Sequence, residues 1–286
     1  MSTVAHGVSN GLQRGLIEAK HKITNFGEIW GEIWPWVLGV VVMYFLRGNT
    51  FGDTGVSVGL LAAPGILGMA VLYTGMMGLS LELVTDKSDG TLLRMKAIPN
   101  GIVGYLTGKF VGRTMMTAVS LLLVSIPAAF LIDGLRLGDA SAWARLGVFY
   151  LLGLLAVLPL GAIIGSLFGS LQGLGLLTLI IMGLVAISGI FYPITSFPGW
   201  LQVIGQLFPL YWLGLGMRSA LLPDSALAAE ISGSWRTLET AAALGVWAVI
   251  GLVLAPLVLR RMTRQATGAS VTPEDPRVPA ARAGAA

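Results

Sequence analysis

Few residues of this 286-residue chain have side chains that could take part in chemistry, because only 11% are charged and none is cysteine. The lack of cysteine excludes disulfides, thiolate metal sites and a cysteine nucleophile. The two histidines, His6 and His21, are both near the start of the chain and lack the His-Glu-x-x-His spacing of a zinc site. We therefore predict no catalytic, metal-binding or cofactor-binding residue in this chain.

The acidic residues are the remaining candidates for chemistry. Four of them lie in segments that we expect to be outer loops between apolar runs, namely Asp133, Asp139, Asp224 and Glu230. An enzyme acting within a membrane would need paired polar groups at matched depth, so we interpret these four as solvated loop charges. Glu82 lies at the end of a predicted span, and no ionisable residue lies near the centre of one. This pattern disfavours an ion-coupled carrier, which needs a site for its driving ion.

The most informative polar stretch covers residues 82–109. Ser88 or Asp89 could cap a short helix that ends at Pro99. Its leucines offer apolar contact and its basic residues offer charge, as a helix that docks into a groove on another protein requires. A plain connecting helix is an equally good interpretation of the residues alone. The residues of this candidate docking helix are Asp86, Lys87, Asp89, Gly90, Thr91, Leu92, Leu93, Arg94, Lys96 and Pro99.

The chain lacks the P-loop that would let it hydrolyse ATP itself. That motif, Gly-x-x-x-x-Gly-Lys-Ser/Thr, cradles phosphates with backbone N–H groups and places magnesium on a hydroxyl. The nearest match, Gly108-Lys109, has Val103 and Phe110 at the two deciding positions. If ATP powers this protein, a separate subunit must bind the ATP and the magnesium.

The rest of the chain has the composition of an all-α integral membrane protein. Its mean hydropathy is +0.81, and 55% of its residues are hydrophobic. Crossing a bilayer takes about 20 apolar residues in a helix. We predict six spans, the first of which is short and could begin near Ile29, at residues 33–46, 56–84, 110–132, 146–168, 171–192 and 238–259.

Two further helical features accompany the predicted spans. In residues 1–28, apolar positions such as Leu12 and Leu16 recur at spacings of three and four, which predicts an amphipathic helix. Such a helix suits the membrane interface, although packing on a partner protein is an alternative. The apolar stretch 200–222 is cut by prolines and carries polar residues, which favours a re-entrant hairpin near the outer surface over a seventh span. The residues that define this hairpin are Pro193, Pro198, Trp200, Pro209 and Arg218.

Charge distribution predicts the orientation of the chain. Most of the 18 Lys and Arg residues fall near the N-terminus, in the loop after the second span, or after the last span. Positive charge concentrates on the cytoplasmic side, so we predict that both termini are cytoplasmic, which six spans allow. We divide the chain into an interfacial helix (1–28), a permease domain (29–265) and a disordered tail (266–286), and we expect no cleavable signal peptide.

A ladder of glycines runs from the fourth predicted span into the fifth. Glycines four residues apart let another helix approach closely in lipid. This ladder could make a contact between two subunits or pack within one, and the sequence does not distinguish these. Its members are Gly161, Gly165, Gly169 and Gly173.

The order of these features resembles one transporter family. An acidic stretch precedes Gly90-Thr91-Leu92, then Pro99, and then Tyr105-Leu106-x-Gly108-Lys109, as in the first cytoplasmic loop of type-2 ABC exporter permeases. The proline-broken hairpin, the six spans and the Arg260-Arg261 end are also similar, and the permeases of daunorubicin-type drug-resistance exporters are the most similar. The resemblance implies that the docking helix is the coupling helix that contacts the ATPase subunit. Asp86, Lys87 and Asp89 stand where the family commonly carries glutamates with arginine.

The resemblance implies that the chain is a permease subunit of a multidrug-type ATP-driven exporter. The expected substrate is hydrophobic or amphipathic, such as a drug, a lipid or a lipid-linked molecule. The expected partners are an ABC ATPase subunit, a second copy or a paralogue of the permease, and the lipid bilayer of a bacterial plasma membrane, with no nucleic acid. An ion-coupled secondary transporter and a non-transporting membrane scaffold are the alternative hypotheses.

Overall fold

The computed structural model describes residues 2–50, 57–98, 101–168 and 171–268, and these ranges are helical apart from turns, loops and one isolated bridge between Thr50 and Ser57. The predicted all-α fold is therefore confirmed. In chain order the elements are α1 (Ser2–Thr24), α2 (Phe26–Leu46), α3 (Val58–Ala70), the π-helix η2 (Val71–Met77), α4 (Gly78–Ser88), α5 (Thr91–Lys96), α6 (Gly101–Leu131), η3 (Arg136–Gly138), α7 (Ala140–Leu167), α8 (Leu171–Ile187), η4 (Ile194–Ser196), α9 (Gly199–Leu207), α10 (Pro209–Leu221), η5 (Asp224–Ala229), η6 (Ile231–Gly233) and α11 (Thr237–Gly268).

Among the described residues, five helices are long and apolar enough to cross a membrane. They are α2, the continuous helix formed by α3, η2 and α4, then α6, α7 and α11. The apolar part of α8 runs only over Gln172–Ile187, which is shorter than the others. The fifth of the six predicted spans is thus not confirmed as a crossing helix, because α8 ends at Ile187 and the chain turns at Gly189 before Tyr192.

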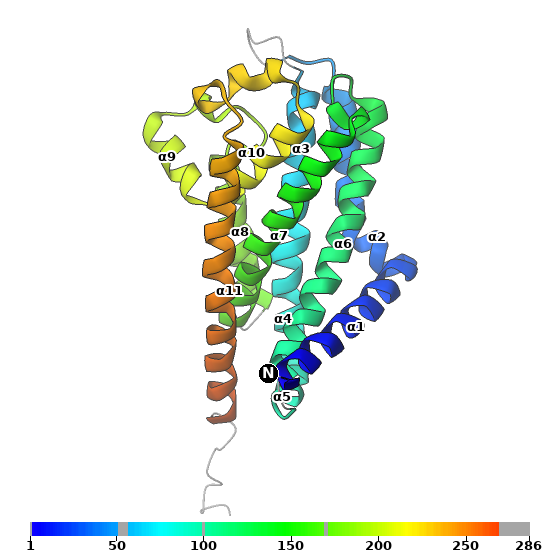
Figure 1. Ribbon diagram of the computed structural model, residues 1–286, viewed down its shortest axis with the longest axis vertical. Helices are drawn as coiled ribbons and strands as arrows, with labels where there is room; N and C mark the ends of the chain where they lie inside the picture. Colours follow the sequence, from blue (N-terminus) through cyan, green and yellow to red (C-terminus); the bar gives the residue numbers. More distant parts are fainter. Residues whose placement is uncertain (1, 51–56, 99–100, 169–170, 269–286) are drawn as a thin grey trace, which may run out of the picture.

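The long helices form an elongated bundle with two distinct ends (Figure 1). We call these the α5 end, where α5 projects, and the α10 end, where α9 and α10 lie. The start of α1 and the end of α11 both lie at the α5 end (Figure 1). This arrangement agrees with the expectation that the two termini share one side, whereas their cytoplasmic placement stays a prediction. Helix α11 continues to Gly268, three residues past the predicted domain boundary, and residues 269–286 lie outside the described ranges.

The helix formed by α3, η2 and α4 is the centre of the bundle, because it is far more buried than any other long helix. Helix α7 packs along it through two members of the glycine ladder. A Cβ atom at Gly161 would lie 2.5 Å from the carbonyl oxygen of Met76, and one at Gly165 would lie 2.7 Å from Cα of Ser80. These two glycines therefore pack against η2 and α4 within the subunit, whereas the predicted alternative, a contact between two subunits, stays a prediction. Gly173 lies against Phe168, and Gly169 falls outside the described residues.

Helix α1 crosses α6 obliquely at the α5 end (Figure 1). A Cβ atom at Gly11 or Gly15 would lie 2.4 or 2.5 Å from the carbonyl oxygens of Gly104 or Gly108, so glycine is required for this approach. The large apolar side chains Leu12 and Leu16 of the predicted amphipathic face are instead exposed, whereas the small Ala19 is buried. Small residues form the contact with the bundle, and the leucines remain available to a lipid surface.

The proline-rich stretch folds into two short helices at the α10 end. Pro198 is the N-cap of α9, and Pro209 is the first residue of α10, where its missing N–H costs nothing. Pro193 likewise precedes the single turn η4. Every residue of α10 is buried, with α3, α7 and α11 packed around it, whereas α9 leaves Trp200 exposed. Neither helix is long enough to span a bilayer.

The close approach of α1 and α6 yields a stability test. Gly15→Ala is expected to lower the apparent melting temperature in detergent, because the new methyl group would overlap the Gly108 carbonyl and overpacking costs about 1–3 kcal/mol. Gly31→Ala in α2 is the matched control, since no atom lies within 4 Å of its Cβ position. Alanine favours helix over glycine, so the control should melt at the same temperature or higher. Equal melting of the two variants would contradict the close packing.

Candidate functional site

Arg113 is a buried cation at the α5 end of the bundle. Arg113 is only 4% exposed, and its guanidinium donates one hydrogen bond of 2.7 Å to Glu32 of α2 and another of 2.7 Å to Glu82 of α4. A third bond of 3.4 Å reaches the carbonyl oxygen of Thr74 in the π-helix η2. The wider turn of a π-helix rearranges backbone carbonyls relative to an α-helix. Arg113 therefore joins α2, η2 and α4 to its own helix, α6.

The backbone next to Arg113 is shaped to admit its side chain. A Cβ atom at Gly78, the first residue of α4, would lie 2.3 Å from a guanidinium nitrogen of Arg113. Any other residue at this position would displace the guanidinium or the helix. Gly78 follows directly on η2, so the end of the π-helix and the space for the cation coincide.

Lys109 lies one helical turn before Arg113 and extends the ionic contacts to α1. Its ammonium group is 3.2 Å from Glu18, 3.4 Å from Glu82 and 3.1 Å from Asp86. Lys22 of α1 is also paired with Glu82 and lies 3.2 Å from Glu18. Each of these cations contacts two or more carboxylates, which partly offsets the cost of burying charge.

These contacts define a charge cluster that joins α1, α2, α4 and α6. The phenol of Tyr105, one turn before Lys109, adds a 2.6 Å hydrogen bond to Asp86. No group of three or more His, Asp or Glu side chains among the described residues is arranged to hold a metal ion. The cluster consists of Glu18, Lys22, Glu32, Glu82, Asp86, Lys109 and Arg113.

A cavity of about 190 Å³ lies beside the charge cluster, between α1, α4, α5 and α6. Its walls include Thr91 and Met95 of α5, Glu18 and Arg14 of α1, and Tyr105 of α6. Helix α5 meets α1 where a guanidinium nitrogen of Arg14 lies 3.8 Å from the sulfur of Met95, and the cavity lies beside this contact.

The predicted docking helix is present as α5, with a different start from the one predicted. Ser88 is the last residue of α4, and Gly90 with φ of 71° is the N-cap of α5, without a side-chain cap. The expected cap by Ser88 or Asp89 is therefore wrong, because α4 runs on to the turn. Asp86 and Lys87 belong to α4, Asp89 forms the turn, Lys96 ends α5, and Pro99 lies outside the described residues.

The leucines of α5 point in different directions. Leu92 is 4% exposed and belongs to the core, whereas Leu93 is 48% exposed. Ile98, just beyond the helix, is 49% exposed. Arg94 is also exposed and donates a 3.1 Å hydrogen bond to the Thr91 hydroxyl. An apolar surface with an adjacent cation therefore projects from this end of the bundle.

The sequence did not single out the charge cluster. In the sequence, Arg113 is one of several basic residues that follow the second predicted span, yet it is buried within α6. A signal was present, because Glu18 and Lys22 are spaced by four, as are Glu82 and Asp86. Tyr105, Lys109 and Arg113 repeat the same spacing in α6. Side chains at this spacing share one face of a helix.

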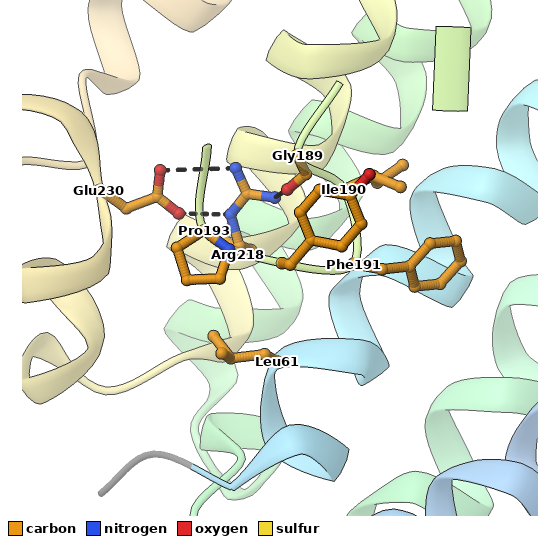
Figure 2. Close-up of a pocket in the computed structure, with 8 residues that line it drawn as sticks. Leu61, Gly189, Ile190, Phe191, Pro193, Arg218 and Glu230 are labelled. Carbon is orange, nitrogen blue, oxygen red and sulfur yellow. Dashed lines mark hydrogen bonds and ion pairs between the residues drawn. The ribbon is translucent and has the colours of Figure 1, made fainter. Parts of the chain in front are cut away.

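A second buried ion pair lies at the α10 end (Figure 2). Arg218 of α10 forms a two-pronged pair with Glu230 and donates a 3.1 Å hydrogen bond to the carbonyl oxygen of Gly189. The expectation that Glu230 is a solvated loop charge is wrong, because Glu230 is only 7% exposed. The turn η5 returns the chain toward α10 and brings the carboxylate to the guanidinium. Arg218 therefore ties α10 to the segment after η5 through Glu230 and to the loop after α8 through Gly189.

Residues 42–257 match the family described as ABC-2 family transporter protein. The chain belongs to this family. The matched range runs from within α2 to within α11 and includes the α4 and α6 parts of the charge cluster. The predicted type-2 ABC permease class is confirmed, and the ABC-2 chain is a multi-pass membrane protein.

A curated relative is consistent with this family. The ABC-2 chain is 27% identical over 149 residues to the Bacillus subtilis (strain 168) protein named "Putative transport permease YvfS". The match covers 51% of this chain and 59% of the relative. The chain thus spans somewhat more than half of the length of the curated relative it matches.

The charge cluster predicts a graded loss of stability. Arg113→Met removes the cation between two carboxylates and is expected to destabilise the fold by about 3 kcal/mol, the low end for breaking a buried pair. Glu32→Gln should cost much less, because Glu32 is more exposed and the amide can still accept a hydrogen bond. Apparent melting temperatures in detergent would measure both. Equal effects of the two substitutions would contradict the central position of Arg113.

The Arg218 pair predicts a similar asymmetry at the other end. Arg218→Met leaves the buried Glu230 carboxylate without its partner and should lower the melting temperature strongly. Adding Glu230→Leu to that variant should restore part of the loss, because no uncompensated charge then remains. If the double variant is no more stable than Arg218→Met, the two residues are not energetically coupled.

Proposed function

We propose that this ABC-2 permease is the membrane subunit of an ATP-driven exporter for a hydrophobic or amphipathic substrate. A separate ATPase subunit that binds ATP and magnesium supplies the energy. The observation that carries the proposal is α5, a short helix with exposed Leu93 and Arg94 that projects from one end of an apolar bundle. Apolar side chains beside a charge suit a helix that fits into a groove on a partner.

The charge cluster supports a role for α5 in transmitting movement. Helix α4, which leads into α5, carries Glu82 and Asp86, and α6, which follows it, carries Lys109 and Arg113. Separating these charges would leave them unpaired in a poorly hydrated place, which costs several kcal/mol per ion. A push on α5 would therefore move α4 and α6 together with α1, and the bundle would respond as a unit.

The interior of the bundle supports the substrate class. Apart from buried Ser and Thr side chains, the described core is apolar, and the strongly buried ion pairs lie toward its two ends, around Arg113 and Arg218. Methionines such as Met76 and Met116 contribute to this core and tolerate varied shapes. An uncharged interior between two charged ends suits a cargo with a large apolar part. In this proposal α5 faces the cytoplasm of a bacterial cell, and a second copy or a paralogue completes the transporter.

Co-purification of an ATPase subunit is the test of this function. Leu93→Asp and Arg94→Glu are expected to reduce ATPase recovery and ATP-dependent transport at least about tenfold, because a contact worth 1.4 kcal/mol changes affinity by that factor. The permease itself should remain folded, since both side chains are exposed. Recovery would be measured after membrane solubilisation with the two genes expressed together.

Ala144→Asp is the matched control for these variants. Ala144 is exposed near the start of α7, toward the α10 end, and therefore lies far from α5 (Figure 1). This variant should retain the ATPase at the level of the unmodified chain. The proposal fails if the unmodified chain never co-purifies with an ATPase, or if its transport continues after ATP is depleted and stops when the proton gradient collapses.

A further inference from the structure

An apolar groove of about 220 Å³ lies between α6, α7 and α11. Phe110 and Thr114 of α6 form one wall, and the buried Leu154 and Leu158 of α7 form the floor. The exposed Leu155 and Leu252 form the rim. Helices α6 and α7 follow each other in the chain, yet both pack on η2, which leaves this space between them.

The groove lies within the predicted membrane layer. Its lining residues all fall inside predicted spans: Phe110 and Thr114 in 110–132, the α7 residues in 146–168 and Leu252 in 238–259. All three helices are long and apolar enough to cross a membrane. The groove is therefore expected to lie at the depth of the lipid acyl chains.

The residues that line the groove are almost all apolar, which suits a hydrocarbon chain. None of its side chains is ionisable, and Thr114 is its one polar residue. The carbonyl oxygen of Thr114 already accepts a hydrogen bond from the Tyr150 hydroxyl. Water in such a space would lack the two to four polar partners that hold a buried water, so the groove stays dry.

The surroundings determine what fills the groove. An unfilled space forfeits dispersion contacts along its walls, and the medium at this depth of a bilayer is acyl chain. The rim leucines are exposed, so the opening faces that medium in the single subunit. We propose that the groove between α6, α7 and α11 is a binding site for one acyl chain of a membrane phospholipid, separate from the α5 surface.

Photolabelling of the full chain in lipid tests the site. The protein would be placed in phosphatidylcholine nanodiscs that contain a phosphatidylcholine with a diazirine in its acyl chain. After illumination, peptides containing Leu155 and Leu252 are expected to carry several-fold more adduct than the peptide containing Leu179 of α8. Leu179 is the comparison because it is 68% exposed and lies outside the groove. Equal labelling of all three positions would overturn the proposal.

Filling the groove provides the matched test. Leu155→Trp should abolish the excess labelling at Leu252, which lies on a different helix, whereas Val148→Trp should preserve it. Val148 is also on α7 and is 54% exposed, but it does not line the groove. If Leu155→Trp does not fold, Leu252→Trp serves the same purpose. In that variant the lipid adduct would be measured on the peptide that contains Leu155. Retained labelling in the folded variant would overturn the site.

The absence of native cysteine separates lipid from a second copy of the chain. Leu155→Cys would be the only cysteine in the protein, and oxidation in the membrane would join two copies only if the grooves face each other. We expect no such dimer. Disulfide-linked dimers together with missing lipid adducts would show that a second copy covers the groove. None of these measurements involves the ATPase. The lipid site can therefore fail its test while the proposed function passes, and the proposed function can fail while the lipid site passes.

Discussion

The arrangement of helices at the α5 end depends on the neutralisation of Arg113. A guanidinium stays protonated in proteins, and this one is almost fully removed from solvent. Two carboxylates from α2 and α4 and one carbonyl from η2 surround it, so three segments must meet at one point on α6. Gly78 provides the space for this meeting. Lys109, one turn away on α6, is also neutralised by carboxylates, and one of them is Glu18 of α1. The position of α5 follows from these contacts, because the helices on either side of it are held by them.

A buried arginine paired with a carboxylate also organises the α10 end, where it holds loops in place. Arg218 cannot lie inside the bundle without an anion, and Glu230 reaches it only because the chain folds back after α10. The bond from Arg218 to the Gly189 carbonyl then fastens the loop after α8 to the same point. Two short helices that are too short to cross a membrane are thereby held in place. Between the two ends the bundle carries few charges, which suits the proposed hydrophobic or amphipathic substrate.

The bundle contains both tightly packed helices and open spaces between helices. Helix α7 meets η2 and α4 through glycines at atomic contact distance, so these helices act as one body. The space beside α5 and the groove between α6 and α7 are the open places. The first lies next to the surface proposed for ATPase contact, and the second lies at membrane depth. A displacement of α5 would change the first space directly and would reach the second through α6, which lines both.

Local sequence determined that the protein is an all-helical membrane protein and where the helices α9 and α10 begin. Apolar runs are helical in lipid because every backbone group must be satisfied within the segment, and Pro198 and Pro209 begin α9 and α10 because proline suits a helix start. The partners of Arg113 and the burial of Glu230 came only from the tertiary structure, since they depend on which distant helices become neighbours. The same holds for α1, where Gly11 and Gly15 contact α6 while the leucines do not. In a water-soluble protein, the apolar face of a helix is the face that packs against the rest of the protein. In a bilayer, that face is equally stable against lipid, so hydrophobicity predicts the helix but not its neighbours.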